Sequence, residues 1–304
     1  MKPQIVNGKP YLVISMSGLQ AFKRCRKSFD IGYMRGYEAI SVPDPVSRGS
    51  SIHKHLAALA TGAYDVLKCV EEGDEDAAIA WAYNVAKPVP TGPRVIAVEQ
   101  PFYRILVEPA GTHTTAMTPG VILRCTFDAA FYLDNPHDNR VNAPKYVVLR
   151  DYKSFDRAPT LHVDLDFQGR IYSAFGMRYF KTRQVFFEYE HIRRTLPNVV
   201  KDKSGGKWSE AECYLNTQLI ISEREADVLW EETRQVAYDL VRAIDEKRFY
   251  RTDLRGSMPH TCATCFWRHG CVAEVQMGVL DKQTAAMFFT VREPITLPEE
   301  ATIE

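Results

Sequence analysis

The sequence predicts an α/β fold in which a group of β-strands is preceded and followed by helices. Before residue 90, apolar residues recur at helical spacing, as at Leu19, Phe22 and Phe29. Over residues 94–192 the pattern changes to short β-branched and aromatic runs, some with the period of two that is typical of strands. A helical pattern at residues 164–180 interrupts these strands, and such alternation indicates an α/β architecture.

Length and charge set the limits of the fold and of its partners. The 304 residues are enough for one large or two ordinary domains. Lys and Arg number 38, as do Asp and Glu, so any nucleic-acid surface must be a local basic patch. The N-terminus lacks a signal-peptide core, and no apolar run approaches the roughly 20 residues of a membrane span. We therefore expect a cytoplasmic protein without a membrane partner.

Helices are expected throughout the N-terminal region. Ser17 to Gln20 has the pattern of a capping box, with Ser17 as the N-cap of the first helix. A second helix is expected to open at residues 48–53 behind a serine cap and to end near Gly62. His53 would lie in its first turn, where a histidine can equally be a satisfied structural residue.

Acidic side chains and a lysine fall at one place among the predicted strands. The strand over residues 145–154 carries Asp151 and Lys153, and both point to one face because strand side chains alternate. The preceding strand, Val121 to Leu133, carries Asp128, which could also be an ordinary strand-edge acid. Carboxylates on adjacent antiparallel strands can share a divalent ion, and a neighbouring lysine can hold a phosphate.

Two helices are expected after these strands. In the first, residues 164–180, Gln168 and Tyr172 lie one turn apart on one face, although such residues can also be plain helix surface. The second, residues 222–248, opens with a capping box formed by Ser222 and Glu225. A strand over residues 185–190 and a basic loop over 193–207 separate the two helices.

The cysteines indicate a metal rather than disulfides. The chain has seven, an odd number, without a secretion signal. Cys262, Cys265 and Cys271 lie close together in the sequence near the C-terminus, which suggests a metal site. Thiolates in such a group suit zinc and an iron–sulfur cluster equally. Other cysteines are most simply buried thiols, namely Cys69, Cys125 and Cys213.

The order of these residues resembles the RecB-like branch of the PD-(D/E)XK nuclease superfamily. That branch has a histidine on an upstream helix, an acid on a strand, an acid-x-lysine motif on the next strand, and Q-x-x-x-Y on the following helix. The matching residues here are His53, Asp128, Asp151 with Lys153, and Gln168 with Tyr172. The stretch Val98 to Phe102, which contains Glu99, resembles the acidic strand that precedes the metal-binding acid.

The resemblance departs from the family pattern in details and implies a definite architecture. Cys125 and Phe127 stand where a glycine and a proline are usual, and Asp151 replaces the commoner glutamate. The implied fold is a restriction-endonuclease-like core, a mixed central sheet flanked by helices, with an N-terminal helical region and a C-terminal iron–sulfur loop. We expect one nuclease domain over residues 1–275 with a helical region (15–90), a catalytic core (94–192), the long helix (222–248) and a cysteine loop (260–271), followed by a tail (276–304).

The resemblance also implies a role for each residue of the site. Mg²⁺ or Mn²⁺ would be held by His53, Asp128, Asp151 and the carbonyl of Tyr152, and mainly oxygen ligands suit these ions. Lys153 would orient the attacking water or stabilise charge on the phosphate. Gln168 and Tyr172 would position the DNA backbone or the lysine.

Cys25, together with the three C-terminal cysteines, resembles the iron–sulfur subset of the branch. This subset includes AddB-type nuclease domains and the CRISPR-adaptation nucleases. There, one cysteine precedes the core and three follow it, and all bind a [4Fe–4S] cluster. The resemblance implies the same ligation by Cys25, Cys262, Cys265 and Cys271, and zinc remains the rival metal.

The expected activity is that of a metal-dependent DNA nuclease, most simply an exonuclease on single-stranded or resected ends in repair or recombination. No G-x-x-x-x-G-K-[ST] motif is present, so unwinding would require a partner helicase, recombinase or single-strand-binding protein. Expected DNA contacts, which could equally be solvated surface or core aromatics, are Lys23, Arg24, Lys27, Arg170, Trp267 and Arg268. The alternative is a DNA-binding accessory module with a structural metal. A compact chain of this kind suggests a prokaryotic or phage-encoded protein.

Overall fold

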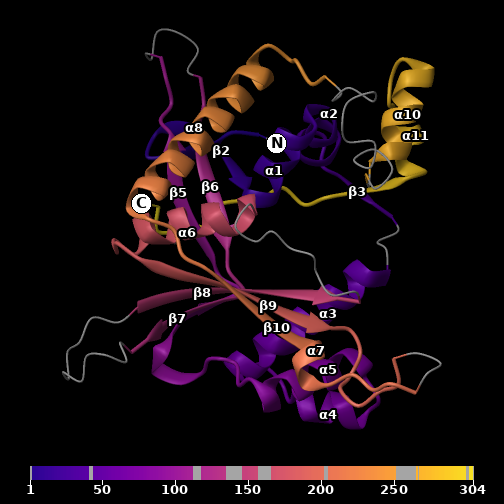
Figure 1. Cartoon of the computed structure of the whole chain (residues 1–304). Coiled ribbons are helices and arrows are strands. Elements are labelled where there is room, and N and C mark those ends of the chain that lie inside the picture. Colours follow the sequence, from indigo (N-terminus) through magenta and orange to yellow (C-terminus); the bar gives the residue numbers. More distant parts are fainter. Residues whose placement is uncertain are drawn as a thin grey trace. The chain divides into compact units, whose positions relative to one another are not determined.

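The computed structural model describes residues 2–40, 44–111, 118–134, 146–156, 166–201, 205–250, 265, 267–298 and 301–303. The chain divides into two compact units, each assembled from separate segments (Figure 1). Unit 1 takes residues 1–42, 102–125 and 231–304, and unit 2 takes residues 43–101 and 126–230. Every residue of the predicted catalytic set belongs to unit 2, whereas the cysteines predicted to hold a cluster belong to unit 1.

Unit 2 is built on a five-stranded sheet with the order β10-β9-β8-β7-β4. The strands are β4 (Val95–Val98), β7 (Ala129–Leu133), β8 (Tyr146–Phe155), β9 (Val185–Arg193) and β10 (Tyr214–Leu219). Strands β8 and β9 are parallel, and the other neighbours are antiparallel. The mixed central sheet that the sequence predicted is therefore confirmed.

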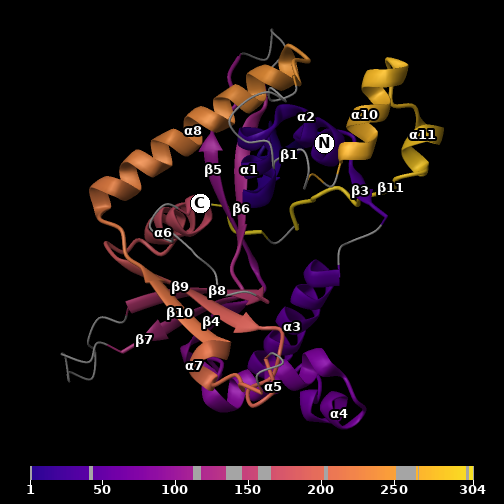
Figure 2. The ribbon, with the colours of Figure 1, turned by 45° about the vertical axis from the view of Figure 1, so that its right-hand side comes forward.

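Helices cover both faces of this sheet, as Figure 2 shows. On one face, α3 (Asp44–Thr61) and α5 (Glu75–Ala86) bury Ile52 and Tyr83 against Tyr152 of β8. On the other face lies α6 (Phe167–Tyr179), where Gly169 leaves room for the ring of Phe187. Because β8 alternates, Tyr152 faces α3 and α5 whereas Asp151 and Lys153 face the side of α6. The short helices η2 (Gly92–Arg94), α4 (Val66–Glu71) and α7 (Glu210–Cys213) complete the unit.

One predicted strand proves to be two. The run from Val121 to Leu133 breaks after β6 (Gly120–Thr126), and β7 begins at Ala129. The strands enter different sheets, because β6 pairs with β2 whereas β7 pairs with β4 and β8. Phe127, in the break, is buried edge-on against Tyr172 of α6 with a centroid distance of 5.0 Å. The sequence predicted Asp128 within a strand. The structure corrects this, because Asp128 lies in the break between β6 and β7.

Two predicted helix starts are also corrected. The first helix, α1 (Met16–Arg24), is capped by Ser15, whose Oγ accepts from the N–H of Gly18 at 3.2 Å. Strand β2 ends at Ser15, so the extended residue before the helix is Ser15 and not Ser17. Helix α3 begins at Asp44, before the predicted serine cap, which places His53 in the helix interior. Its end is as predicted, with Gly62 at a φ of +70°.

Unit 1 contains a four-stranded sheet with the order β1-β2-β6-β5 and a two-stranded pair, β11-β3. Its strands are β1 (Gln4–Val6), β2 (Lys9–Ser15), β3 (Tyr37–Ala39), β5 (Pro101–Val107), β6 and β11 (Phe289–Val291). Its helices are α1, α2 (Arg26–Phe29), the π-helix η1 (Asp30–Met34), α10 (Arg268–Met277) and α11 (Lys282–Ala286). Helix α8 (Glu223–Asp245) runs from unit 2 into unit 1.

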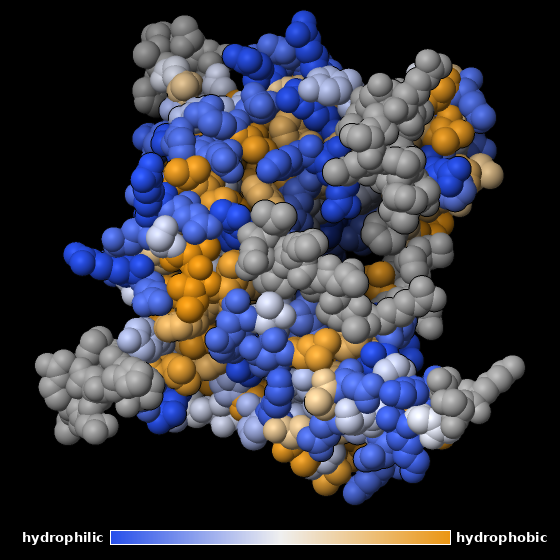
Figure 3. Space-filling view, viewed as in Figure 1, coloured by the Kyte–Doolittle hydropathy of each residue, from blue (hydrophilic) through white to orange (hydrophobic). Residues whose placement is uncertain are grey.

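The C-terminal residues of unit 1 are more structured than the predicted tail suggests. Strand β11 pairs with β3, and the Gln4 side chain bonds to the backbone of Ile295 and Leu297. Exposed apolar side chains gather on α10 and just after α11, at the right edge of Figure 3, and include Val272, Val275 and Met287. Among the described residues, no helix is long and apolar enough to cross a membrane.

Candidate active site

Acidic residues meet at one end of the five-stranded sheet because of its strand directions. Glu99 follows the end of β4, Asp128 precedes β7, and Asp151 lies near the end of β8. Since β4 is antiparallel to β7 and β7 to β8, these points fall at the same end of the sheet. The pairing of Ala129 with Arg150 brings Asp128 and Asp151 next to each other.

Asp128 is the centre of this group. Its Oδ2 accepts a hydrogen bond of 2.5 Å from the N–H of Tyr152 and lies 3.4 Å from Nδ1 of His53 on α3. Its own carbonyl accepts from the N–H of Glu99 at 3.3 Å. The carboxylate of Asp128 is thus fixed from β8 and from α3, and its backbone from the turn after β4.

Glu99 completes the set and was missing from the predicted metal ligands. Ligand atoms of His53, Glu99 and Asp128 all lie within 4.8 Å of one another, the single such group among the described residues. Glu99 has a φ of +52°, a left-handed conformation that turns the chain between β4 and β5. The sequence signal was the resemblance of Val98 to Phe102 to an acidic strand, which gave no role to the side chain itself.

Asp151 and Lys153 lie on the same face of β8, as predicted, and form a close ion pair. Asp151 is only 4% exposed, and the ammonium of Lys153 approaches its Oδ2. The Nζ of Lys153 also lies 5.7 Å from the ring centroid of Tyr189 on β9. The lysine therefore stands beside the carboxylates rather than in bulk solvent.

The crowding of carboxylates changes their proton affinities. Burial and the charge of Asp128 raise the pKa of Asp151 to about 6, and the same two causes raise the pKa of Glu99 to about 7. Burial alone would raise the pKa of Asp128, but His53 and the N–H of Tyr152 hold it below its usual value. Burial opposes the charge on Lys153, yet Asp151 raises the pKa of the lysine. Asp151 and Glu99 thus hold their protons to a higher pH than ordinary carboxyl groups.

The donor set fits a hard divalent cation. One imidazole nitrogen and several carboxylate oxygens converge, and such oxygen-rich sites suit Mg²⁺ or Mn²⁺ better than a soft metal. The raised pKa values of Asp151 and Glu99 reflect mutual repulsion that a cation would relieve. Tyr152 has its N–H directed at Asp128, and strand geometry directs its carbonyl to the same edge, as the predicted carbonyl ligand requires.

The helix residues of the predicted set lie in different environments. Tyr172 is buried in the core, edge-on to Phe127 and to Phe187. Gln168 is half-buried in the first turn of α6 and its N–H donates to the capping Asp166 at 3.4 Å. The sequence did not single out Asp166 or Tyr189, whose hydroxyl donates to Asp166. Nothing but strand alternation would have marked Tyr189.

The predicted DNA-contact residues also differ in availability. Lys27 is buried between Asp30 (2.8 Å) and Glu274 (2.6 Å), so it is not a surface contact, and Arg170 pairs with Glu225. The indole N–H of Trp267 donates to the carbonyl of Tyr37 at 2.9 Å. Exposed basic residues remain at Lys23, Arg24 and Arg268. Of the predicted DNA contacts, Lys27 is therefore withdrawn from the surface.

Three of the four predicted cluster ligands are described, and all three are half-buried in unit 1: Cys25, Cys265 and Cys271. Cys25 precedes α2 and Cys271 lies on α10. The ion pairs of Glu274 with Lys27 and Arg35 connect α10 to the helices that follow Cys25. Cys262 lies outside the described residues.

Comparison with known proteins gives a family. The family model described as the PD-(D/E)XK nuclease superfamily matches residues 13–272 of this chain. No curated protein matches the sequence. One similar solved structure, "Crystal structure of SSO0001", has a TM-score of 0.36 and 11% identity, covering 84% of this chain and 83% of that chain. A likeness this distant supports no inference about function. The family match, by contrast, spans both the candidate site and the predicted cluster cysteines.

Proposed function

The chain belongs to the PD-(D/E)XK nuclease superfamily, and we propose that it is a metal-dependent DNA nuclease that hydrolyses phosphodiester bonds. The observation that carries the proposal is the convergence of His53, Glu99 and Asp128 on one point. The ion pair of Asp151 with Lys153 lies beside that point, since the two aspartates adjoin across β7 and β8. A fold retained only for DNA binding would not need this acid–lysine set.

His53, Glu99, Asp128 and Asp151 would hold Mg²⁺ or Mn²⁺, which when bound would polarise the scissile phosphate and lower the pKa of a water. The chain supplies the rest of the chemistry. Lys153 keeps its charge, because Asp151 raises its pKa, and so presents an ammonium to the negative charge that grows on the phosphate. Asp128 is held ionised by His53 and the N–H of Tyr152.

The fixed backbone keeps these groups in position. Tyr152, between the two functional residues of β8, is buried among Ile52 and Tyr83 and locks the strand against α3 and α5. Gln168, in the first turn of α6, would approach the DNA backbone from the same face as Lys153. Because Tyr172 packs against Phe127, its part would be to hold α6 and the turn carrying Asp128 together.

The further proposal concerns the substrate. We assign the chain to exonucleases that act on single-stranded or resected DNA ends, in repair or recombination, with a partner that unwinds or coats the DNA. This extends the resemblance to the RecB-like branch, whose motif order the sequence follows. Exposed basic residues that support a DNA path in unit 1 are Lys23, Arg24 and Arg268.

A [4Fe–4S] cluster held by Cys25, Cys262, Cys265 and Cys271 belongs to the same proposal. Thiolates are the ligands that such clusters require, and three of these residues share unit 1. Support comes from the ion pairs of Glu274 and from the close approach of Trp267 to Gly32, which hold the two cysteine-bearing segments together. Four thiolates would also hold zinc, so the metal itself must be identified.

Digestion of labelled linear and closed circular single strands, with Mn²⁺ present, tests the proposed function. An exonuclease shortens the linear strand and leaves the circle intact. Cleavage of both the linear and the circular strand would support a nuclease but would make it an endonuclease instead of an exonuclease. If neither strand is cut at any tested metal concentration while the protein shifts the mobility of both, the accessory DNA-binding role replaces the proposed activity.

A further inference from the structure

An open pocket of about 330 Å³ adjoins the active site within unit 2. Its walls come from Gly49 and Ser50 of α3, from Lys153 and Ser154 of β8, and from Arg194 just after β9. His53 also lines it, so the pocket is continuous with the candidate metal site.

The side chains that line the pocket and can carry a positive or negative charge near neutral pH are all basic. They are His53, Lys153 and Arg194, and no carboxylate is among the lining residues that the structure describes. Each of the three has a carboxylate partner that does not line the pocket, namely Asp128 for His53, Asp151 for Lys153 and Asp156 for Arg194. A cavity with cations in its walls and carboxylates only outside favours an anion.

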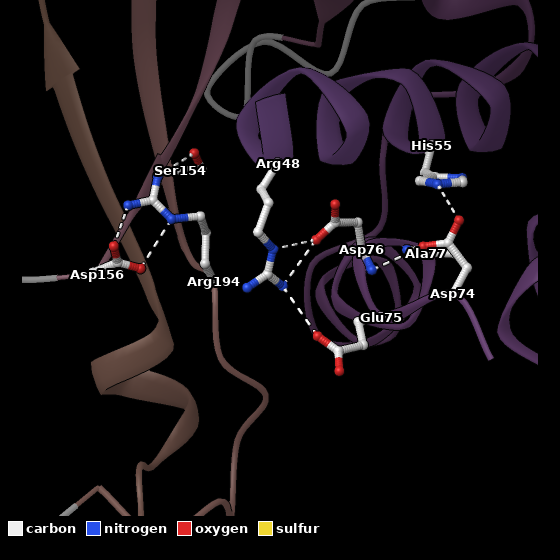
Figure 4. A network of polar contacts seen from close by, with 9 residues as sticks. All are labelled: Arg48, His55, Asp74, Glu75, Asp76, Ala77, Ser154, Asp156 and Arg194. Atoms are coloured by element: carbon white, nitrogen blue, oxygen red, sulfur yellow. Dashed lines mark hydrogen bonds and ion pairs between the residues drawn. The ribbon is translucent and has the colours of Figure 1, made fainter. Parts of the chain in front are cut away.

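Arg194 is held in a fixed orientation. Its Nε donates to Oδ1 of Asp156 at 2.9 Å and its Nη2 donates to Oδ2, while Nη1 donates to Oγ of Ser154 at 3.1 Å (Figure 4). The side chain is only 11% exposed. Because Ser154 Oγ accepts from the arginine, its own O–H is directed elsewhere and can donate to a ligand.

The backbone adds a donor at the same place. Tyr152 directs its N–H toward the β7 side of β8, where it reaches Asp128. Residues two apart in a strand direct their N–H groups to the same side, so Ser154 also directs its N–H to this edge. Strand β7 pairs with β8 only as far as Arg150, so it does not cover this edge beside Ser154.

Gly49 allows α3 to approach this edge. A Cβ at position 49 would lie 2.7 Å from Ser154 Oγ, so any larger residue would displace the serine side chain. Ser50 contributes less, because its Oγ donates to the carbonyl of Val46 at 3.1 Å within the helix. The donors that remain for a ligand are therefore the hydroxyl and N–H of Ser154, next to the charge of Arg194.

We propose that this pocket binds a second phosphate group of the DNA strand, next to the phosphate that Lys153 and the metal ligands would hold. The inference rests on the proposed nuclease function and adds a subsite to it. Ser154 would donate from its hydroxyl and backbone N–H, and Arg194 would orient the serine and supply charge. The ligand is a phosphate either within the strand, as a diester, or at its end, as a monoester.

The test uses single-stranded oligonucleotides in which one phosphate at a time is replaced by a neutral methylphosphonate. With the unaltered protein, a methylphosphonate at one position beside the cleaved bond should lower kcat/KM about tenfold. This is the effect expected when a hydrogen bond to a charged group is lost. Ser154→Ala and Arg194→Gln should remove this position-specific penalty. Arg183→Gln is the matched control, because the Arg183 side chain is 91% exposed and pairs only at the surface with Glu223.

A second arm compares strands with and without a terminal phosphate. Loss of a terminal-phosphate preference in Ser154→Ala identifies the monoester as the ligand, and loss of the internal penalty identifies the diester. Gly49→Ala, with no change to any polar group, should reproduce the effect of Ser154→Ala. Thermal melting of each variant checks folding.

The possible failures are distinguishable. Cleavage by the unaltered protein with the same penalties in Ser154→Ala, Arg194→Gln and Gly49→Ala overturns the subsite and leaves the nuclease in place. Absence of any cleavage by the unaltered protein contradicts the proposed function and the subsite with it.

Discussion

The backbone N–H of Tyr152 donates a 2.5 Å hydrogen bond to Oδ2 of Asp128. This contact joins the break between β6 and β7 to the strand that carries Asp151 and Lys153. It also lowers the pKa of Asp128, because a hydrogen bond to the ionised carboxylate stabilises that form. The position of the Asp128 carboxylate beside β8 is therefore fixed by a main-chain donor.

Removal of the lysine should abolish cleavage and spare the fold. Lys153→Ala is expected to lower kcat by a factor on the order of 10²–10³, the usual cost of losing one charge-stabilising group. Initial rates on labelled DNA measure this, with circular dichroism for folding. Lys68→Ala, at a lysine side chain that is 72% exposed, is the control. Full activity in Lys153→Ala would show that this lysine has no part in the reaction.

Glu99→Gln should act in opposite directions on the metal-free and metal-bound protein. The charge of Asp128 raises the pKa of Glu99, so removing the Glu99 charge relieves repulsion and should raise the metal-free Tm. The same change removes a ligand and should weaken Mn²⁺ binding about tenfold or more, seen as a smaller Tm rise with added Mn²⁺.

Glu75→Gln provides the comparison for this experiment, since the Glu75 side chain is 85% exposed and outside the site. It should leave the Mn²⁺-induced Tm rise unchanged. An equal Mn²⁺ response in Glu99→Gln and Glu75→Gln would remove Glu99 from the ligand set.

The metal-free protein should lose stability as pH rises. Asp151 has a pKa of about 6 in the folded chain against 3.8 as its ordinary value, so the folded state binds the extra proton between these pH values. Unfolding then becomes easier with rising pH, by on the order of 1–2 kcal/mol across that window. His53 acts in the same direction, since its pKa is also raised and its contribution fades as pH rises through that value.

Denaturant unfolding at pH 4.5 and 7 in EDTA measures this slope. Asp151→Asn should flatten it, because the variant cannot titrate, and saturating Mn²⁺ should add more stability at pH 7 than at pH 4.5. An unaltered slope in Asp151→Asn would mean that the buried carboxyl does not titrate in this range.

Loss of Cys25 should destabilise unit 1 if four cysteines share one cluster. Anaerobically purified protein is expected to be brown, and Cys25→Ser to lose both colour and several degrees of Tm. Cys69→Ser, at a half-buried cysteine in unit 2, is the control and should keep the colour. A colourless protein with stoichiometric zinc would replace the cluster by a zinc site.

The sequence was sufficient for features that follow from local periodicity. Alternation in β8 put Asp151 and Lys153 on one face, and helix α6 begins within three residues of the predicted start. The break at Asp128 was not foreseeable, because apolar alternation continues through Phe127 although the chain there changes from one sheet to another. Periodicity reports burial on one face, not which sheet provides it.

The partners of residues that are fixed by tertiary contacts could not be predicted from the sequence. Lys27 was expected at a DNA surface, but Glu274, far away in sequence, pairs with it in the interior. Arg194 was part of a basic loop, and its partners Ser154 and Asp156 come from the neighbouring strand. Glu99 needed the pairing of β4 with β7 before it could be placed beside Asp128. Charge patterns in one segment cannot reveal such partners.

We propose that the carboxylates and Lys153 form a metal-dependent nuclease site. The most direct measurement is cleavage of end-labelled linear DNA by the intact protein in EDTA, then in Mg²⁺ or Mn²⁺, beside Asp128→Asn. We predict no cleavage in EDTA, cleavage on addition of either ion, and a loss on the order of 10²-fold or more in Asp128→Asn at the same metal concentration. Cleavage that persists in EDTA, or that survives unchanged in Asp128→Asn, would contradict the account.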